Sequence, residues 1–137
     1  MRLPATPRLL PALLLAAACA SPTQPAPVQV RPAAAAHVRG AEGDAVVGYA
    51  VSNVGAAAVL LTSTCGARLA PGVERREGGG WAQYAGGFCL TVEDMSPKPL
   101  AAGATRDEVV RIREAGAYRL VIGTERGPAR SGEFRVR

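Results

Sequence analysis

The sequence predicts a small all-β domain, and three observations favour this class. From Val28 onward, apolar residues tend to recur at every second position, as they do in half-buried strands. Glycine and proline interrupt this pattern every several residues, which is typical of a sandwich or barrel. No stretch of the 137 residues has a convincing amphipathic helical period. We therefore expect about seven to nine short antiparallel strands.

The first 18 residues have the layout of a secretory signal peptide. Arg2 and Arg8 supply its positive end, and residues 9–18 form a short apolar stretch that Pro11 interrupts. This stretch is too short to cross a bilayer, and no later segment is long and apolar enough. The sequence thus predicts an exported chain that is not an integral membrane protein.

The end of this segment, Leu15-Ala16-Ala17-Ala18-Cys19, resembles the lipobox of bacterial lipoproteins. In that family the cysteine becomes the first residue of the mature chain and is acylated. Ala16 stands where the family prefers leucine, and ordinary signal cleavage after Ala20 is the alternative. The resemblance implies a lipid-anchored chain in the cell envelope. It favours the outer membrane, because alanine and not aspartate follows Cys19, with the domain in the periplasm or at the cell surface.

Residues 19–27 comprise the lipidated cysteine and a proline-rich tether. In an extended form, this tether would hold the domain roughly 25 Å from the anchored end. The domain itself is expected over residues 28–137. Its strands are predicted, in chain order, at residues 28–30, 47–51, 57–62, 68–75, 81–84, 88–92, 110–113, 118–122 and 134–136, with a loop over residues 97–103.

The stretch from Cys65 to Cys89 holds the only tryptophan, Trp81, and three consecutive glycines that predict a hairpin turn. Two cysteines remain in an exported chain once Cys19 is assigned to lipid, and we expect them to form a disulfide that ties off the hairpin. A buried thiol pair and a metal site are the alternatives. A zinc site would need two more ligands, and His37 is the only histidine.

Large core candidates are few, so a covalent link would add useful stability. They are scattered valine, leucine and isoleucine residues and six aromatic ones: Tyr49, Trp81, Tyr84, Phe88, Tyr118 and Phe134. For Trp81 two interpretations remain open. It packs in the core near the disulfide, or it is a partly exposed aromatic anchor for a binding partner.

Glu114-Ala115-Gly116-Ala117-Tyr118 resembles the tyrosine corner of immunoglobulin-like sandwiches. The resemblance implies that the Tyr118 hydroxyl bonds to upstream backbone. Leu120 stands where an antibody domain has a cysteine, so any disulfide would lie elsewhere.

A wider resemblance is carried by four motifs in order: residues 49–53, 75–81, 100–103 and 116–120. They are similar to the strand ending in asparagine, the Gly-x-Trp-type hairpin, the leucine-x-proline-glycine turn and the Gly-x-Tyr-Arg strand of a bacterial immunoglobulin-like domain family. Ala102 replaces the turn proline. A bacterial intracellular proteinase-inhibitor family is similar in outline. The resemblance implies an immunoglobulin-like antiparallel β-sandwich.

Removing Arg2 and Arg8 with the signal lowers the formal charge from +5 to +3. No basic run is interleaved with aromatics, so we expect no nucleic-acid partner. The arginines toward the C-terminus would either touch anionic lipid headgroups or form a solvated sheet face.

No serine–histidine–acid set, phosphate-binding glycine loop or metal-ligand cluster is evident, so we expect neither an enzyme nor a cofactor or metal site. The sequence favours a lipid-anchored, non-enzymatic envelope binding or accessory domain, with an envelope protein as partner and with Trp81 and Arg119 as candidate binding residues. The alternative is a protease-inhibitor-like module that presents residues 97–103 or the glycine hairpin to a protease.

Overall fold

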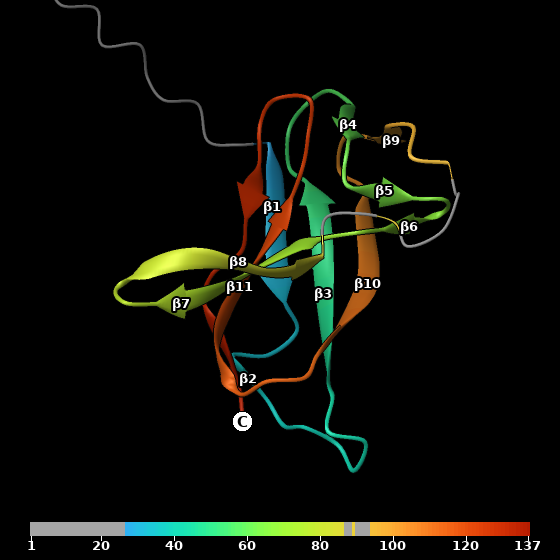
Figure 1. Ribbon diagram of the computed structural model, residues 1–137. Helices are drawn as coiled ribbons and strands as arrows, with labels where there is room; N and C mark the ends of the chain where they lie inside the picture. The colour runs from blue at the N-terminus through green and yellow to red at the C-terminus, as the bar shows by residue number, and fades with distance from the viewer. Residues whose placement is uncertain (1–26, 87–88, 90–93) are drawn as a thin grey trace, which may run out of the picture.

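The computed structural model describes residues 27–86, 89 and 94–137, and every regular element in this part of the chain is a strand. The all-β prediction is therefore confirmed (Figure 1). The signal peptide, Cys19, most of the tether and Phe88 lie outside the described residues. Among those described, no helix is available that could span a bilayer.

Three long strands make the first sheet, in the spatial order β1-β3-β10. They are β1 (Val28–Pro32), β3 (Ala45–Asn53) and β10 (Thr105–Ile112), and both pairings are antiparallel. Along β3 the residues alternate between buried and more exposed positions, as the period-two pattern predicts. The central strand thus turns one face toward the core and the other outward.

The second sheet has six strands and runs in the order β2-β13-β11-β7-β8, with β12 also paired to β11. Its members are β2 (Ala36–His37), β7 (Gly72–Glu77), β8 (Gly80–Gly86), β11 (Gly116–Ile122), β12 (Ala129–Arg130) and β13 (Phe134–Val136). The pairing of β13 with β2 is parallel and the others are antiparallel.

Two small two-stranded sheets complete the fold. One pairs β4 (Val59–Leu61) with β9 (Lys98–Leu100), and the other pairs β5 (Thr64–Cys65) with β6 (Arg68–Leu69). The expected loop over residues 97–103 therefore contains a strand. Residues 68–75, expected as one strand, are divided between β6 and β7.

One hydrophobic core is shared by the two larger sheets. The first sheet supplies Val28, Val30, Ala45, Val47, Tyr49, Val51 and Ile112, and the second supplies Val73, Tyr118, Leu120, Ile122, Ala129, Phe134 and Val136. Figure 1 shows β7 and β8 of the second sheet running across the direction of the three long strands. Because each sheet hides its apolar face against the other, both outer faces are left for polar residues and for contacts with other molecules.

The triple glycine forms the predicted hairpin turn. Glu77 pairs with Gly80, and the two residues between them, Gly78 and Gly79, have φ angles of 54° and 83°. Positive φ at both central positions is the signature of a two-residue turn that suits the twist of the strands, and glycine adopts it without steric cost. In Figure 1 the β7–β8 hairpin extends beyond the other strands.

Cys65 and Cys89 form a disulfide, with 5.5 Å between their Cα atoms. The bond does not join the two strands of the glycine hairpin, as the sequence had suggested. It links the end of β5 to a residue beyond β8, so it holds the base of the whole segment that contains the hairpin.

Trp81 is not a core residue, which corrects one of the two interpretations left open above. It pairs with Arg76 on the face of β8 that points away from the core, and it is partly exposed. The pairing shifts by one residue between Val73 and Glu74, and this bulge places Tyr84 on the core side, where its ring meets Tyr118 at 5.2 Å. Tyr84 therefore packs against the core, and Trp81 lies outside it.

Candidate functional site

Two guanidinium groups contact the ring of Trp81 on the outer face of the six-stranded sheet. The Arg119 guanidinium is 4.4 Å from the centroid of this ring, and that of Arg76 is 4.6 Å away. A cation this close to an indole is attracted by the electron-rich face of the ring. Both residues that the sequence marked as candidate binding residues, Trp81 and Arg119, are therefore in contact, although they are far apart in the chain.

The register of three neighbouring strands produces this stack. The two-residue turn pairs Arg76 of β7 with Trp81 of β8, and Arg119 of β11 pairs with Glu74 of β7. Side chains on one face of a sheet meet their partners directly across and diagonally. Trp81 thus packs against one arginine from the adjacent strand and another from the strand beyond it.

Two glutamates hold the arginines of this face in place. Glu74 pairs with Nε of Arg119 and lies 3.9 Å from Nε of Arg130. Glu133 pairs with Arg76 at 2.7 Å and lies 3.8 Å from Arg135. We call these residues, together with Trp81, the Trp81 face: Glu74, Arg76, Trp81, Arg119, Arg130, Glu133 and Arg135. Its arginines outnumber its glutamates, so the face keeps a net positive charge.

A small pocket of about 240 Å³ lies on the same outer face, next to Glu74. Gln83 and Val121 line it from β8 and β11, and Ser63 and Gly123 close one end. The main-chain amide of Gly123 donates to the Ser63 hydroxyl at 2.7 Å, which joins the two sides of that end. The pocket extends the Trp81 face with a hollow that a partner side chain could enter.

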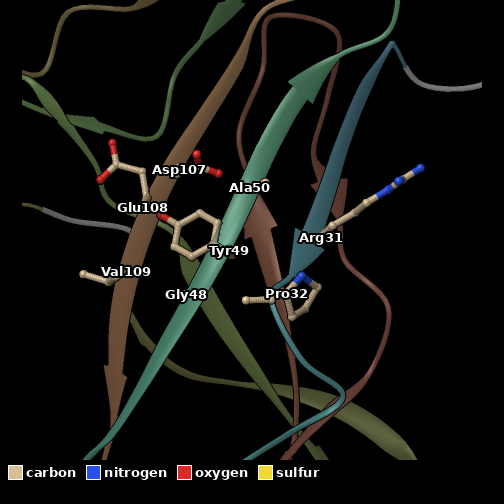
Figure 2. Close-up of a pocket in the computed structure, with 9 residues that line it drawn as sticks. Arg31, Pro32, Gly48, Tyr49, Ala50, Asp107, Glu108 and Val109 are labelled. Atoms are coloured by element: carbon tan, nitrogen blue, oxygen red, sulfur yellow. The ribbon is translucent and has the colours of Figure 1, made fainter.

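The outer face of the three-stranded sheet carries a wider depression of about 650 Å³ (Figure 2). It forms where Gly48 and Ala50 leave little side chain on the central strand, between Arg31 of β1 and Asp107 of β10. In Figure 2 the Arg31 side chain points away from the carboxylates of β10. The depression therefore has opposite charges on its two sides, and among the described residues no ion pair joins Arg31 to Asp107 or Glu108.

Tyr49 lies beside this depression but faces the core, with its ring 3% exposed. Its hydroxyl is buried and has no hydrogen-bond partner among the described residues. Burial raises the pKa of Tyr49 well above its usual value, and the negative charge of Glu108 raises it further. Glu108 is itself paired with Arg106 at 2.6 Å. The tyrosine stays protonated at neutral pH.

The remaining predicted positions have structural partners. The Tyr118 hydroxyl donates to the Glu114 carbonyl, and Cys65 is bonded to Cys89. His37 lies within 3.0 Å of the Ala34 carbonyl and stacks edge-on against Phe134. Within the described ranges, no three histidine, cysteine, aspartate or glutamate residues come together as a metal site would require.

Sequence patterns did not mark Arg76, Glu74 or Glu133 as site residues. A two-residue turn at Gly78 and Gly79 fixes the pairing of Arg76 with Trp81, so that contact could have been found from the glycines alone. The positions of Glu74 and Glu133 depend on pairings with β11 and β13, which no local pattern specifies.

Comparison with known proteins gives no family. No protein-family model matches the chain, and no curated protein matches it. One solved structure that it resembles is that of the Pseudomonas fluorescens alkylpurine DNA glycosylase AlkC bound to DNA containing an abasic site analog. The TM-score is 0.44 at 15% identity, over 82% of this chain and 31% of the glycosylase chain.

The glycosylase is an enzyme and its structure contains DNA, so the match stands against two expectations made above. These are the absence of an enzymatic activity and the absence of a nucleic-acid partner, and both are withdrawn. At this TM-score the likeness assigns neither an activity nor a ligand to the present chain.

Proposed function

We propose that this chain is a lipid-anchored binding domain of the cell envelope, with an immunoglobulin-like β-sandwich that contacts a partner protein through the Trp81 face. The observation that carries the proposal is the stack of Arg76 and Arg119 on the Trp81 ring. Tryptophan and arginine are enriched among the residues that dominate the energy of protein interfaces. Few large side chains are available for the core, yet Trp81 lies outside it. A role in binding explains this position better than a role in the stability of the fold.

The ion pairs on this face preorganise the two arginines that contact Trp81. Arg119 is fixed by Glu74, and Arg76 by Glu133, so both guanidinium groups are oriented before a partner arrives. Fewer side chains then lose freedom on association, which leaves more of the contact energy as affinity. The excess of arginine over glutamate suits a partner with an acidic surface.

Three further features support the immunoglobulin-like fold. The two sheets share one core, the Tyr118 hydroxyl reaches back to the Glu114 carbonyl, and the motif order resembles a bacterial immunoglobulin-like family. The lipobox-like residues before Cys19 support the anchor. The proteinase-inhibitor alternative loses one of its contact loops, because Lys98–Leu100 is a strand paired with β4.

Site-specific photo-crosslinking in intact cells tests the binding face. A photoreactive residue at Val121, in the pocket beside Glu74, should capture one envelope protein. The same residue at Val109, which is 66% exposed on the outer face of the other sheet, is the matched control and should capture none. Capture from Val121 should be lost when Trp81 is replaced by alanine. Equal capture from both positions, or capture that survives Trp81→Ala, would contradict the proposal.

The anchor is tested separately. The mature chain should carry acyl groups on Cys19, measured as added mass on its first peptide, and Cys19→Ser should release the chain from the membrane fraction. A mature chain without acyl groups would remove the anchor and leave the binding face to be judged on the crosslinking alone.

A further inference from the structure

We propose that two copies of this chain pack face to face through the outer face of the three-stranded sheet, about a two-fold axis that runs along β3. This face carries the wide depression shown in Figure 2. The core lies between the two larger sheets, so this face is turned away from the Trp81 face. The pairing would cover the depression and leave both Trp81 faces free.

Three rows of side chains cross this outer face, because each outward residue of β3 lies beside one residue of β1 and one of β10. The rows are Gln29–Ser52–Thr105, Arg31–Ala50–Asp107 and Ala33–Gly48–Val109. Neighbouring strands lie about 5 Å apart, so each row is about 10 Å wide. The central residue of each row is small, which makes the middle of the face lower than its two sides.

Arg31 and Asp107 flank the middle row, and neither forms an ion pair among the described residues. The other two aspartates, Asp44 and Asp94, both pair with basic side chains. Arg31 donates at 2.6 Å to the side-chain oxygen of Gln29, which carries no charge. Both Arg31 and Asp107 are exposed, so each is available to an opposite charge on another molecule.

Gly48, within β3, is not required by the fold of a single chain. A Cβ added there would lie 3.5 Å from the Cβ of Ala33, which is an ordinary van der Waals distance, and its φ angle is not positive. The pairing of β3 with β10 continues through it without a bulge. Glycine within a strand commonly marks a bulge, a bend or a place where another molecule approaches closely. Close approach is the explanation that fits this position.

Two exposed valines lie beside Gly48 on the same face. Val46, two residues earlier on β3, is 52% exposed, and Val109, opposite Gly48 on β10, is 66% exposed. Apolar area that a partner removes from water stabilises the complex. The outer face thus combines an apolar middle with one unpaired charge on each side.

The arrangement of these charges identifies a second copy as the partner and fixes the direction of the axis. A two-fold axis along β3 places β1 of one chain over β10 of the other. The facing residues are then Gln29 with Thr105, Arg31 with Asp107, and Ala33 with Val109, each contact being made twice. An axis across the strands would instead place Arg31 over Arg31 and Asp107 over Asp107, and like charges would repel.

The packing of two such sheets has ordinary dimensions. Sheets that pack face to face lie about 10 Å apart, with strand directions within about 30° of each other. Gly48 and Ala50 lie on the axis, where small residues permit this approach, and the longer side chains of Arg31 and Asp107 flank them. The pairing does not depend on what the Trp81 face binds. A dimer would present two Trp81 faces on opposite sides.

Charge reversals test this arrangement in the full chain as isolated from cells. Sedimentation over a concentration series should reach a mass of two chains for the wild type. Arg31→Glu alone and Asp107→Arg alone should each weaken self-association about tenfold or more, because like charges then face each other twice. The double variant Arg31→Glu/Asp107→Arg should recover the dimer, because both pairs return with their charges exchanged. Glu77→Lys, at an exposed position of the hairpin, is the control and should remain dimeric.

Gly48→Thr tests the close approach without changing any charge. Threonine suits a strand, and the space beside Ala33 accepts a Cβ, so the urea midpoint of the single chain should not fall. Its side chain would stand between the two sheets, so self-association should weaken about tenfold or more. A Gly48→Thr chain that folds and pairs like the wild type would contradict the proposed contact.

Three sedimentation results would overturn the proposal: a wild-type mass of one chain throughout the series, a dimer that both single reversals leave intact, or a double variant that does not recover it. Crosslinking gives a further check. A photoreactive residue at Val109, which should capture no other envelope protein, should join two copies of this chain into a product of twice its mass. The absence of that product would also contradict the pairing. Since capture from Val121 reports on the Trp81 face alone, the two proposals can fail separately.

Discussion

The hydroxyl of Tyr118 donates a hydrogen bond to the main-chain carbonyl of Glu114, with 2.9 Å between the two oxygens. The Tyr118 side chain is fully buried, and Arg75 lies over its ring, 5.9 Å from the centroid. Arg75 also pairs with the Glu114 carboxylate at 2.6 Å. The corner before β11 is therefore held from both sides, by the tyrosine beneath it and the arginine beside it.

We expect Tyr118→Phe to lower the free energy of unfolding by about 1 kcal/mol, because it removes one hydrogen bond and leaves the ring in place. It should also change the dependence of stability on pH. Burial raises the pKa of Tyr118 from 10.0 to about 12, although the positive charge of Arg75 acts to lower it. A raised pKa stabilises the fold below pH 10, and this contribution is lost as the pH rises toward 12.

Urea unfolding at about pH 8 and about pH 11 measures both effects. The wild type should lose more stability between the two conditions than Tyr118→Phe does. Tyr49 is present in both proteins, so its own raised pKa does not affect the comparison. Equal losses would show that Tyr118 titrates in the folded chain as it does in the unfolded one.

Asn53, at the end of β3, is almost fully buried and uses its amide on three neighbours. Its Nδ2 donates to the carbonyls of Ala57 and Leu100, and its Oδ1 accepts from the amide of Gly55. Asn53→Asp should cost about 3 kcal/mol of unfolding free energy, because an oxygen would replace the donor that faces two carbonyls.

Denaturant unfolding compares this variant with Ser52→Ala, which removes one exposed hydrogen bond to Thr105 from the adjacent position. The control should cost less than about 1 kcal/mol. Similar losses for the two variants would mean that the Asn53 amide is not a significant source of stability.

The disulfide should contribute about 3 kcal/mol, since it closes a loop with a sequence separation of 24 residues. The double variant Cys65→Ser/Cys89→Ser should unfold at a correspondingly lower urea concentration. Adding a reductant to the wild type should give the same midpoint, and the double variant should not respond to it. A wild type that is insensitive to the reductant would contradict this estimate.

The sequence predicted the local features of the fold well. The glycine turn, the alternation along β3 and β11, and the opposite directions of Ile112 and Arg111 all follow from short-range patterns, and the structure has them. Such features depend on the chain a few residues to either side. A pattern is enough to specify them.

Contacts between distant segments were not predictable in the same way. The prolines and glycine of residues 97–103 predict a loop, yet Lys98–Leu100 pairs with β4, some 40 residues earlier in the chain. Trp81 faces outward because of the turn register, while the bulge sends Tyr84 inward, and composition alone favoured burial of both rings. Pairing between remote strands decides these positions, and one sequence does not reveal it.

The contact between Glu74 and Arg119 gives the last prediction, because Arg119 lies over the ring of the only tryptophan in the sequence. Glu74→Gln removes the charge that orients Arg119, so the guanidinium should spend less time over the Trp81 ring. The indole should become more hydrated, and its fluorescence emission should shift to longer wavelength. Unfolding free energy should fall by about 1 kcal/mol. Glu77→Gln, at an exposed position of the same strand with no ion pair among the described residues, is the control and should leave the emission unchanged. An unshifted spectrum for Glu74→Gln would show that Arg119 keeps its place over the ring without the glutamate.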